Sequence, residues 1–233
     1  MSAPPLANTF AGGSDGVAIT AGNSGGGSGN AFNAVAGTDW LFESSDGVPS
    51  AQAVNPLDSS YLEWQALGTI TGAVYTRFYV NLPSTPTTNH WVAGCFVNAA
   101  LSSVFAPFVF ATDGKLYDGG TVSGLTFATG TWFRVESRVV PSTSGAGESE
   151  YRYYADPLLD VNSWTTRTQR TGLTMGIANI DRWRFLGGAG AANSTVSPRV
   201  KNVAISTVDF IGPTPPPPTL RTVVQSGLRL ART

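Results

Sequence analysis

The sequence predicts an all-β fold, a jelly-roll sandwich in which two antiparallel sheets pack face to face. Of its 233 residues, 27 are glycine and 15 proline, while only 12% are charged, a composition typical of short strands joined by turns. Short apolar or alternating segments recur along the chain and predict about a dozen strands. No segment sustains the 3.6-residue period of a helix. The length suits one large domain with appended segments.

The first thirty residues are predicted to pack on the sandwich as an opening strand followed by a glycine-rich loop. Leu6 and Phe10 supply apolar anchors for that strand, whereas residues 11–30 offer few side chains to bury. We assign residues 31–212 to the jelly-roll domain. Its first strands are expected at residues 31–35 and 40–42, where apolar residues return in short runs.

The middle of the domain alternates with the period of two that marks half-buried strands. Within residues 73–80, one face takes Val74, Thr76, Phe78 and Val80, and the other takes Tyr75, Arg77 and Tyr79. Residues 91–98 and 103–112 are almost continuously apolar, which predicts strands covered on both sides. Asp113 and Gly114 then form a hairpin turn, because both accept positive φ.

Residues 131–140 alternate most clearly and predict a central strand of a sheet with one open face. Phe133, Val135 and Val139 are expected to point inward, and Trp132, Arg134, Glu136 and Arg138 outward. A flexible tip at residues 145–147 returns the chain into a strand near residues 151–154. Further strands are expected at residues 181–186 and, closing the domain, at residues 198–206.

Charge and cysteine content exclude several functions. The formal net charge of −1 gives no field that would gather nucleic acid or an anionic membrane. No stretch approaches the roughly 18 apolar residues of a membrane span, and no signal peptide is evident, so synthesis in the cytoplasm is expected. The single cysteine, Cys95, is expected in the core, and the single histidine, His90, does not favour a histidine metal cage.

Five segments, taken in order, are similar to concanavalin A-like, laminin-G-like jelly rolls of actinobacterial proteins and of the virion proteins of their phages. They are residues 8–16, 77–80, 131–136, 181–185 and 201–206, and the resemblance covers roughly residues 8–212. It implies a sandwich whose concave sheet or rim loops are available to a partner. Members of this superfamily bind glycans, act as adhesive or decorating modules or, in separate branches, cleave polysaccharides.

Catalytic and metal signatures are weak. Glu148 and Glu150 form the only Glu-x-Glu pair, the pattern of a retaining glycosidase, but their place after a glycine-rich tip predicts a solvated turn. Glu43, Glu63 and Glu136 stand alone in their strands, so no enzyme activity is expected. Calcium would need several oxygen ligands, and the turn aspartates do not form a run: Asp113, Asp118, Asp156 and Asp160. No cofactor is predicted and the metal question stays open.

Aromatic side chains are the candidate glycan contacts, since a flat ring stacks on a sugar face. The candidates are Tyr75, Tyr79, Trp91, Trp132 and Trp164, each weighed against ordinary core packing or contact with another protein chain.

The C-terminus predicts a tether. Residues 213–218 favour an extended polyproline linker, and residues 219–233 carry three arginines and no acid among apolar residues. Such a peptide orders itself only by docking on a neighbour, unless it is simply a frayed end. The expected anchor residues are Leu220, Arg221, Val223, Val224, Leu228, Arg229, Leu230 and Arg232.

These features together favour a structural protein of a bacteriophage virion, displayed on the head or tail and anchored through its terminus. Its expected partners are other virion proteins, further copies of itself as a homo-oligomer, and a host cell-surface glycan, with no nucleic acid and no membrane insertion. The alternatives are a stand-alone carbohydrate-binding module and, with less support, a polysaccharide hydrolase or lyase.

Overall fold

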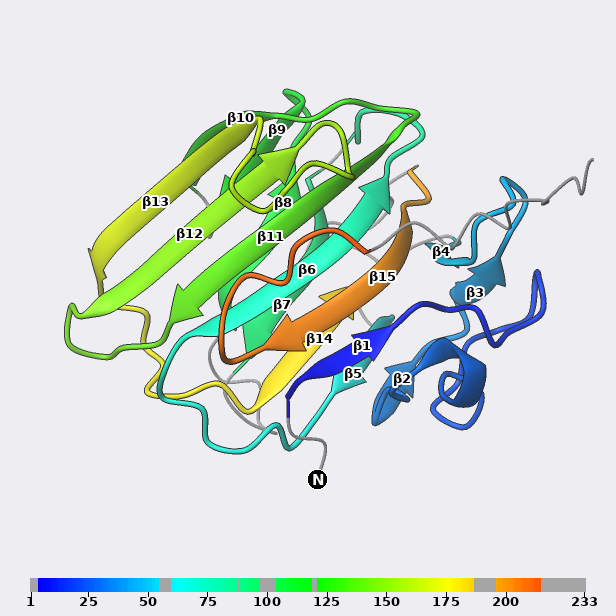
Figure 1. Ribbon diagram of the computed structural model, residues 1–233, viewed down its shortest axis with the longest axis horizontal. Helices are drawn as coiled ribbons and strands as arrows, with labels where there is room; N and C mark the ends of the chain where they lie inside the picture. The colour runs from blue at the N-terminus through cyan, green and yellow to red at the C-terminus, as the bar shows by residue number, and fades with distance from the viewer. Residues whose placement is uncertain are drawn as a thin grey trace, which may run out of the picture.

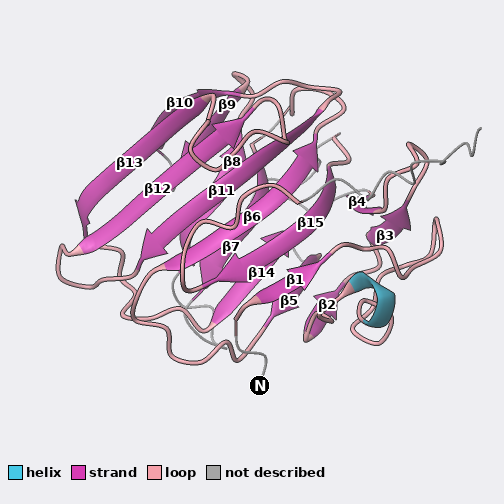
Figure 2. Ribbon diagram, in the orientation of Figure 1, coloured by secondary structure: helices cyan, strands magenta, loops and turns pink. Residues whose placement is uncertain are grey.

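The computed structural model is a two-layered β-sandwich (Figure 1). It describes residues 4–54, 60–87, 89–96, 104–118, 121–186 and 196–214. Fifteen strands and one short 3-10 turn, Gly26–Ser28, form this part of the chain (Figure 2). The all-β, antiparallel prediction is therefore confirmed. Within the described residues, no helix has the length and apolar character needed to span a membrane.

The larger sheet has eight strands, and seven of them follow one another across it. In spatial order these are β13 (Thr166–Leu173), β12 (Gly147–Tyr154), β11 (Trp132–Val140), β6 (Val74–Asn81), β15 (Arg199–Ser206), β4 (Ser50–Ala53) and β3 (Trp40–Glu43). The eighth, β1 (Leu6–Asn8), also pairs with β15.

The smaller sheet has seven strands and packs behind the larger one (Figure 1). In spatial order they are β10 (Thr121–Thr126), β9 (Lys115–Asp118), β8 (Val104–Phe110), β7 (His90–Phe96), β14 (Arg182–Leu186), β5 (Tyr61–Trp64) and β2 (Ala34–Ala36). The strand expected at residues 31–35 therefore begins three residues later than the apolar run suggests.

The core lies between the sheets and is rich in aromatic rings. Phe78 of the larger sheet meets Phe108 and Phe185 of the smaller one edge to face, at centroid distances of 5.0 and 5.6 Å. Phe133 and Val135 are fully buried, as the alternation of residues 131–140 predicts. This packing makes the two sheets a rigid platform for the side chains on their outer faces.

Two local features give the sheets their shape. Gly114 has φ +75°, and the side chain of Asp113 accepts a hydrogen bond from the amide of Lys115 at 3.1 Å, so the predicted hairpin between β8 and β9 is confirmed. In β15 the register shifts between Lys201 and Ala204, and Asn202 takes φ 48°. The bulge lies in the pairing of β15 with β6, and on its other edge β15 pairs first with β4 and then with β1.

The N-terminal segment folds against the sandwich. Phe10 is buried and its ring stacks on Phe32, with the centroids 5.9 Å apart. The side-chain amide of Asn8 donates to the carbonyl oxygens of Ser24 and Asn30 at 2.6 and 2.9 Å, which closes the glycine-rich loop on the opening strand.

Candidate functional site

The candidate site is the outer face of the larger sheet, which we call the polar face. Paired residues on neighbouring antiparallel strands point to the same side, so the register defines rows across this face. One row runs through Lys201, Tyr79, Arg134 and Tyr154, the next through Arg77, Glu136, Arg152 and Arg167, and a third through Tyr75, Arg138, Glu150 and Gln169.

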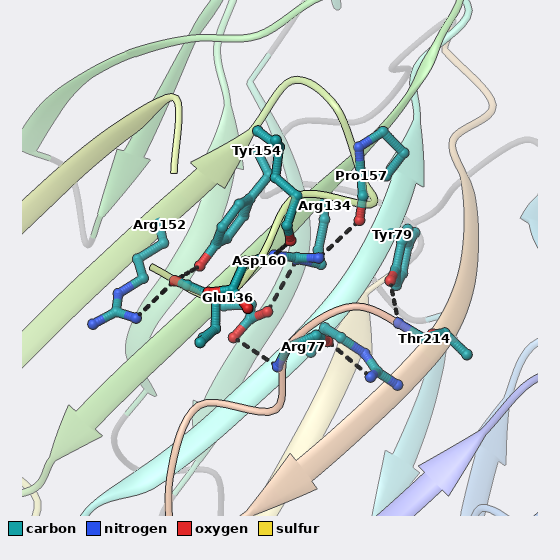
Figure 3. A network of polar contacts seen from close by, with 12 residues as sticks. Arg77, Tyr79, Arg134, Glu136, Arg152, Tyr154, Pro157, Asp160 and Thr214 are labelled. Carbon is teal, nitrogen blue, oxygen red and sulfur yellow. Dashed lines mark hydrogen bonds and ion pairs between the residues drawn. The ribbon is translucent and has the colours of Figure 1, made fainter. Parts of the chain in front are cut away.

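A loop covers one part of the polar face. Residues 155–164, which we call the covering loop, follow β12 and lie over the sheet (Figure 3). The carbonyl oxygens of Pro157, Leu159 and Val161 accept hydrogen bonds from side chains of the sheet. Arg134 donates to the carbonyls of Pro157 and Leu159 at 2.8 and 2.7 Å, and its guanidinium lies 3.8 Å from the ring centroid of Tyr154. Arg134 is consequently fully buried.

A second segment covers the centre. Residues 207–214, which we call the strap, turn back at the end of β15 and run over β6 toward β11 (Figures 1 and 3). Arg77 donates to the carbonyl of Gly212 at 3.0 Å, and the amide of Gly212 donates to Glu136 at 3.4 Å. Farther along, the amide of Thr214 donates to the hydroxyl of Tyr79 at 2.7 Å.

The sequence predicts an open face at this position, and that expectation is wrong for its centre. Arg134 and Glu136 point outward as predicted, but both are 0% exposed because the covering loop and the strap lie over them. The alternation of residues 131–140 fixes the side of the sheet to which these side chains point. It contains no information about segments that fold back from elsewhere in the chain.

Positive charge predominates beneath the two covers. Among the described residues, the buried Arg77, Arg134 and Arg152, with the partly exposed Arg167 at the edge, surround two carboxylates, Glu136 and Glu150. Burial raises the pKa of Glu136, and the neighbouring arginines and the Gly212 amide oppose that rise. Burial also lowers the pKa of Arg77. Arginines therefore outnumber carboxylates in this cluster. Backbone carbonyl groups of the covering loop and the strap accept the hydrogen bonds that the carboxylates do not.

One end of the polar face is only partly covered, and we call it the rim: Lys201 and Trp132 there are half-buried. The ammonium of Lys201 lies 4.0 Å from the ring centroid of Trp132, whose indole donates to Asp46 at 2.9 Å. Burial lowers the pKa of Lys201. Beside it runs a groove of about 520 Å³ lined by Tyr79, Lys201, Leu158 and Thr214 among others. An apolar groove edged by a cation suits a partner with both apolar and anionic parts.

The structure gathers four of the five candidate aromatic residues at the polar face, each already in contact with the protein's own groups. Tyr75 packs edge to face on Phe210, Tyr79 binds Thr214, and Trp132 holds Lys201. The ring of Trp164 lies 4.8 Å from the guanidinium of Arg152. The fifth, Trp91, lies in β7 of the other sheet, and its side chain is outside the described set.

The structure corrects the expectation for the Glu-x-Glu pair. Glu148 and Glu150 lie within β12 rather than in a solvated turn, and Glu150 is 4% exposed. Glu150 forms ion pairs with Arg152 and Arg167, both at 2.7 Å, and Glu148 pairs with Arg138. The turn signal at residues 145–147 is real, but the strand resumes at Gly147, earlier than the sequence suggests.

The lone glutamates also have partners. Glu43 pairs with Arg199 at 3.1 Å, and the fully buried Glu63 of the smaller sheet pairs with Arg182 and Arg184. Within the described residues, no group of three His, Cys, Asp or Glu side chains is arranged to hold a metal ion. The expected anchor, residues 219–233, lies outside the described part of the chain.

Several solved structures share this architecture. No family model matches the chain, and no curated protein matches it. Solved structures do match, among them the alginate lyase of Aplysia kurodai, 12% identical, with a TM-score of 0.53 over 72% of this chain and 87% of that one. The endo-β-1,4-glucuronan lyase of Trichoderma reesei is 9% identical, with a TM-score of 0.52 over 87% and 94%. The Chlorella virus alginate lyase vAL-1 is 11% identical, with a TM-score of 0.52 over 72% and 88%.

The fold is that of the concanavalin A-like jelly rolls. The predicted resemblance is thereby confirmed at the level of fold, and identities this low establish nothing finer.

Several residues that build this site were missed by sequence reasoning. Arg152, Lys201 and Phe210 were not candidates, although Arg152 stands between two tyrosines of an alternating strand and Lys201 alternates with Arg199 in the closing strand. That alternation was a usable signal for the two cations. Phe210 lies beyond the last strand, and only the folded chain shows that its ring lies 3.5 Å from the guanidinium of Arg152.

Proposed function

We propose that this chain is a non-catalytic module that binds acidic glycans through the polar face of its larger sheet. The observation that carries the proposal is the concentration of guanidinium groups and aromatic rings on one sheet face. Guanidinium groups pair with carboxylates in bidentate geometry, and aromatic rings stack on sugars. The ligand class agrees with the shared fold, because the matching enzymes are named for alginate and glucuronan, both acidic polysaccharides.

The rim is the part of this face where a glycan would first bind. Lys201 offers a cation next to the groove that Tyr79 and Leu158 line, and Leu158 is 58% exposed. A carboxylate-bearing sugar placed there would meet the ammonium group while its ring packs on apolar side chains.

The absence of catalysis is part of the proposal. The carboxylates of the polar face form ion pairs with arginines: Glu136 with Arg134, Glu148 with Arg138, and Glu150 with Arg152 and Arg167. Glu150, which is held in two ion pairs, is a poor nucleophile or base, because both guanidinium groups stabilise its negative charge. Reducing-sugar release from alginate or glucuronan by the purified protein would overturn this part of the proposal.

The binding test compares two lysines. We expect the full-length protein to bind alginate or polyglucuronate with an affinity that falls as salt rises, and not to bind neutral dextran. Lys201→Met should weaken binding about tenfold, the effect of losing one well-placed charge contact. Lys115→Met is the matched control, since Lys115 forms an exposed pair with Asp113 in the hairpin of the other sheet. Equal binding by both variants would contradict a site at the rim.

We further propose that the module is carried on a bacteriophage particle, with residues 219–233 docked on another virion protein or on further copies of this chain. The support is the composition of this segment, which combines arginines and apolar residues after a proline run. Deleting residues 215–233 leaves the strap in place and should release the protein from purified particles. Unchanged occupancy, measured by quantitative mass spectrometry, would contradict anchoring by this segment.

A further inference from the structure

The strap occupies the places that a ligand of the polar face would need. The carbonyl of Gly212 accepts from Arg77, and the ring of Phe210 lies 3.5 Å from the guanidinium of Arg152 and packs on Tyr75. A carboxylate would bind the same guanidinium groups, and a sugar ring would stack on the same aromatic faces. The strap lies over the centre of the sheet (Figure 3), so the strap and a glycan exclude each other there.

The strap is held less firmly than the strands beneath it. It forms no β-ladder, and among the described residues only two of the strap have backbone hydrogen bonds with side chains of β6 and β11: Gly212 with Arg77 and Glu136 at 3.0 and 3.4 Å, and Thr214 with Tyr79 at 2.7 Å. Val208 is 85% exposed. Segments with few buried apolar contacts and no ladder open at a lower free-energy cost than the core of a domain.

The groups beneath the strap favour a stronger acceptor than a carbonyl. Arg77 is 7% exposed and donates to two carbonyl oxygens, those of Asn202 and Gly212, at 3.2 and 3.0 Å. A carboxylate can accept two parallel hydrogen bonds from one guanidinium and also neutralises its charge, whereas a carbonyl brings no charge. A ligand that brings negative charge to this cluster would also offset its excess of positive charge.

We propose that residues 207–214 form an autoinhibitory cover that competes with acidic glycans for Arg77, Arg152 and the tyrosines beside them. This inference rests on the proposed function, since it makes the centre of the polar face a second binding region whose access the strap controls. With the strap closed, a glycan reaches only the rim, and with the strap open it extends across the centre of the sheet. The apparent affinity is then reduced by the fraction of molecules that are open.

The test uses full-length protein and weakens the strap without touching the arginines. Phe210→Ala removes the ring that packs on Arg152 and Tyr75, and Gly212→Val places a branched side chain at φ +73°. Val208→Ala is the control in the same segment. Hydrogen exchange at the Gly212 and Thr214 amides reports opening, thermal unfolding reports whether each variant is folded, and titration calorimetry with polygalacturonate reports affinity.

We expect both strap variants to lose protection at Gly212 and Thr214 and to bind polygalacturonate about tenfold more tightly, or more, than the wild type and Val208→Ala. Dextran sulfate in place of polygalacturonate tells whether the cluster accepts sulfate as well as carboxylate, and neutral dextran should not respond.

Three outcomes would overturn the proposal. If the amides lose protection while the affinity stays at a measurable wild-type value, the strap is not inhibitory, and the proposed function survives. If wild type and opened variants alike bind no acidic polymer, the proposed function fails with it. If folded variants keep both amides protected, the strap is a fixed part of the sheet rather than a cover.

Discussion

Nε of Arg134 and Oε1 of Glu136 lie 3.0 Å apart on β11, and neither side chain has any exposed surface. Their contact is an ion pair rather than an aligned hydrogen bond, because both atoms lack a hydrogen-bond partner among the described residues. Arg134 also fixes the covering loop through the carbonyls of Pro157 and Leu159. One guanidinium therefore joins the sheet to the segment above it.

We expect Arg134→Met to destabilise the protein by about 3–5 kcal/mol, because it leaves the buried Glu136 with less compensation and frees the covering loop. Urea unfolding measures this loss. Lys115→Met, which breaks an exposed pair with Asp113, is the control and should change stability by less than about 1 kcal/mol. Similar losses in both variants would mean that the buried pair contributes no more to the free energy of unfolding than the exposed pair does.

The two buried glutamates of the polar face should respond to pH in opposite directions. Burial raises the pKa of Glu136, despite its arginine neighbours and the Gly212 amide. Burial also favours a higher pKa for Glu150, but hydrogen bonds from Arg167 and Arg152 outweigh it, so that the pKa of Glu150 is lowered. A raised pKa stabilises the fold at low pH and loses that contribution as pH rises, whereas a lowered pKa does the reverse.

Relative to Glu136→Gln, the free energy of unfolding of the wild type should therefore fall as pH rises above the ordinary pKa of 4.5. Relative to Glu150→Gln, it should fall as pH drops below that same value. Denaturant unfolding at several pH values measures both differences. Slopes of the same sign for the two variants would show that the environments of these carboxylates are not opposed.

Alanine substitutions at two glycines should distinguish the cost of backbone strain from the cost of a steric clash. Gly29 has φ +110°, and a Cβ there would lie 2.5 Å from the carbonyl oxygen of Ala7, whereas Gly47 has φ +75° with nothing within 4 Å. We expect Gly47→Ala to cost about 1–2 kcal/mol from conformation alone, and Gly29→Ala to cost more because β1 must also move. Thermal unfolding gives both values. Equal costs would indicate that β1 can shift away from the added Cβ without loss of stability.

The strand pattern shows which features of the fold can be predicted from the sequence. The alternation at residues 73–80 and 131–140 correctly assigns Phe78 and Phe133 to the core and Arg77 and Glu136 to the outer face. Such assignments depend only on the period of two along a strand. The same rule failed for Glu150, because it does not tell where a turn ends and the next strand begins.

By itself, the sequence determined the sandwich, the hairpin at Gly114 and the side of the sheet to which each strand residue points, since these follow from neighbours a few positions away. Only the tertiary structure decided that the outer face is covered. Gly212 contacts Glu136 across 76 positions, and Arg134 meets Leu159 across 25. Contacts at such separations form because the folded sheet brings distant segments together. No local spacing in the chain records them.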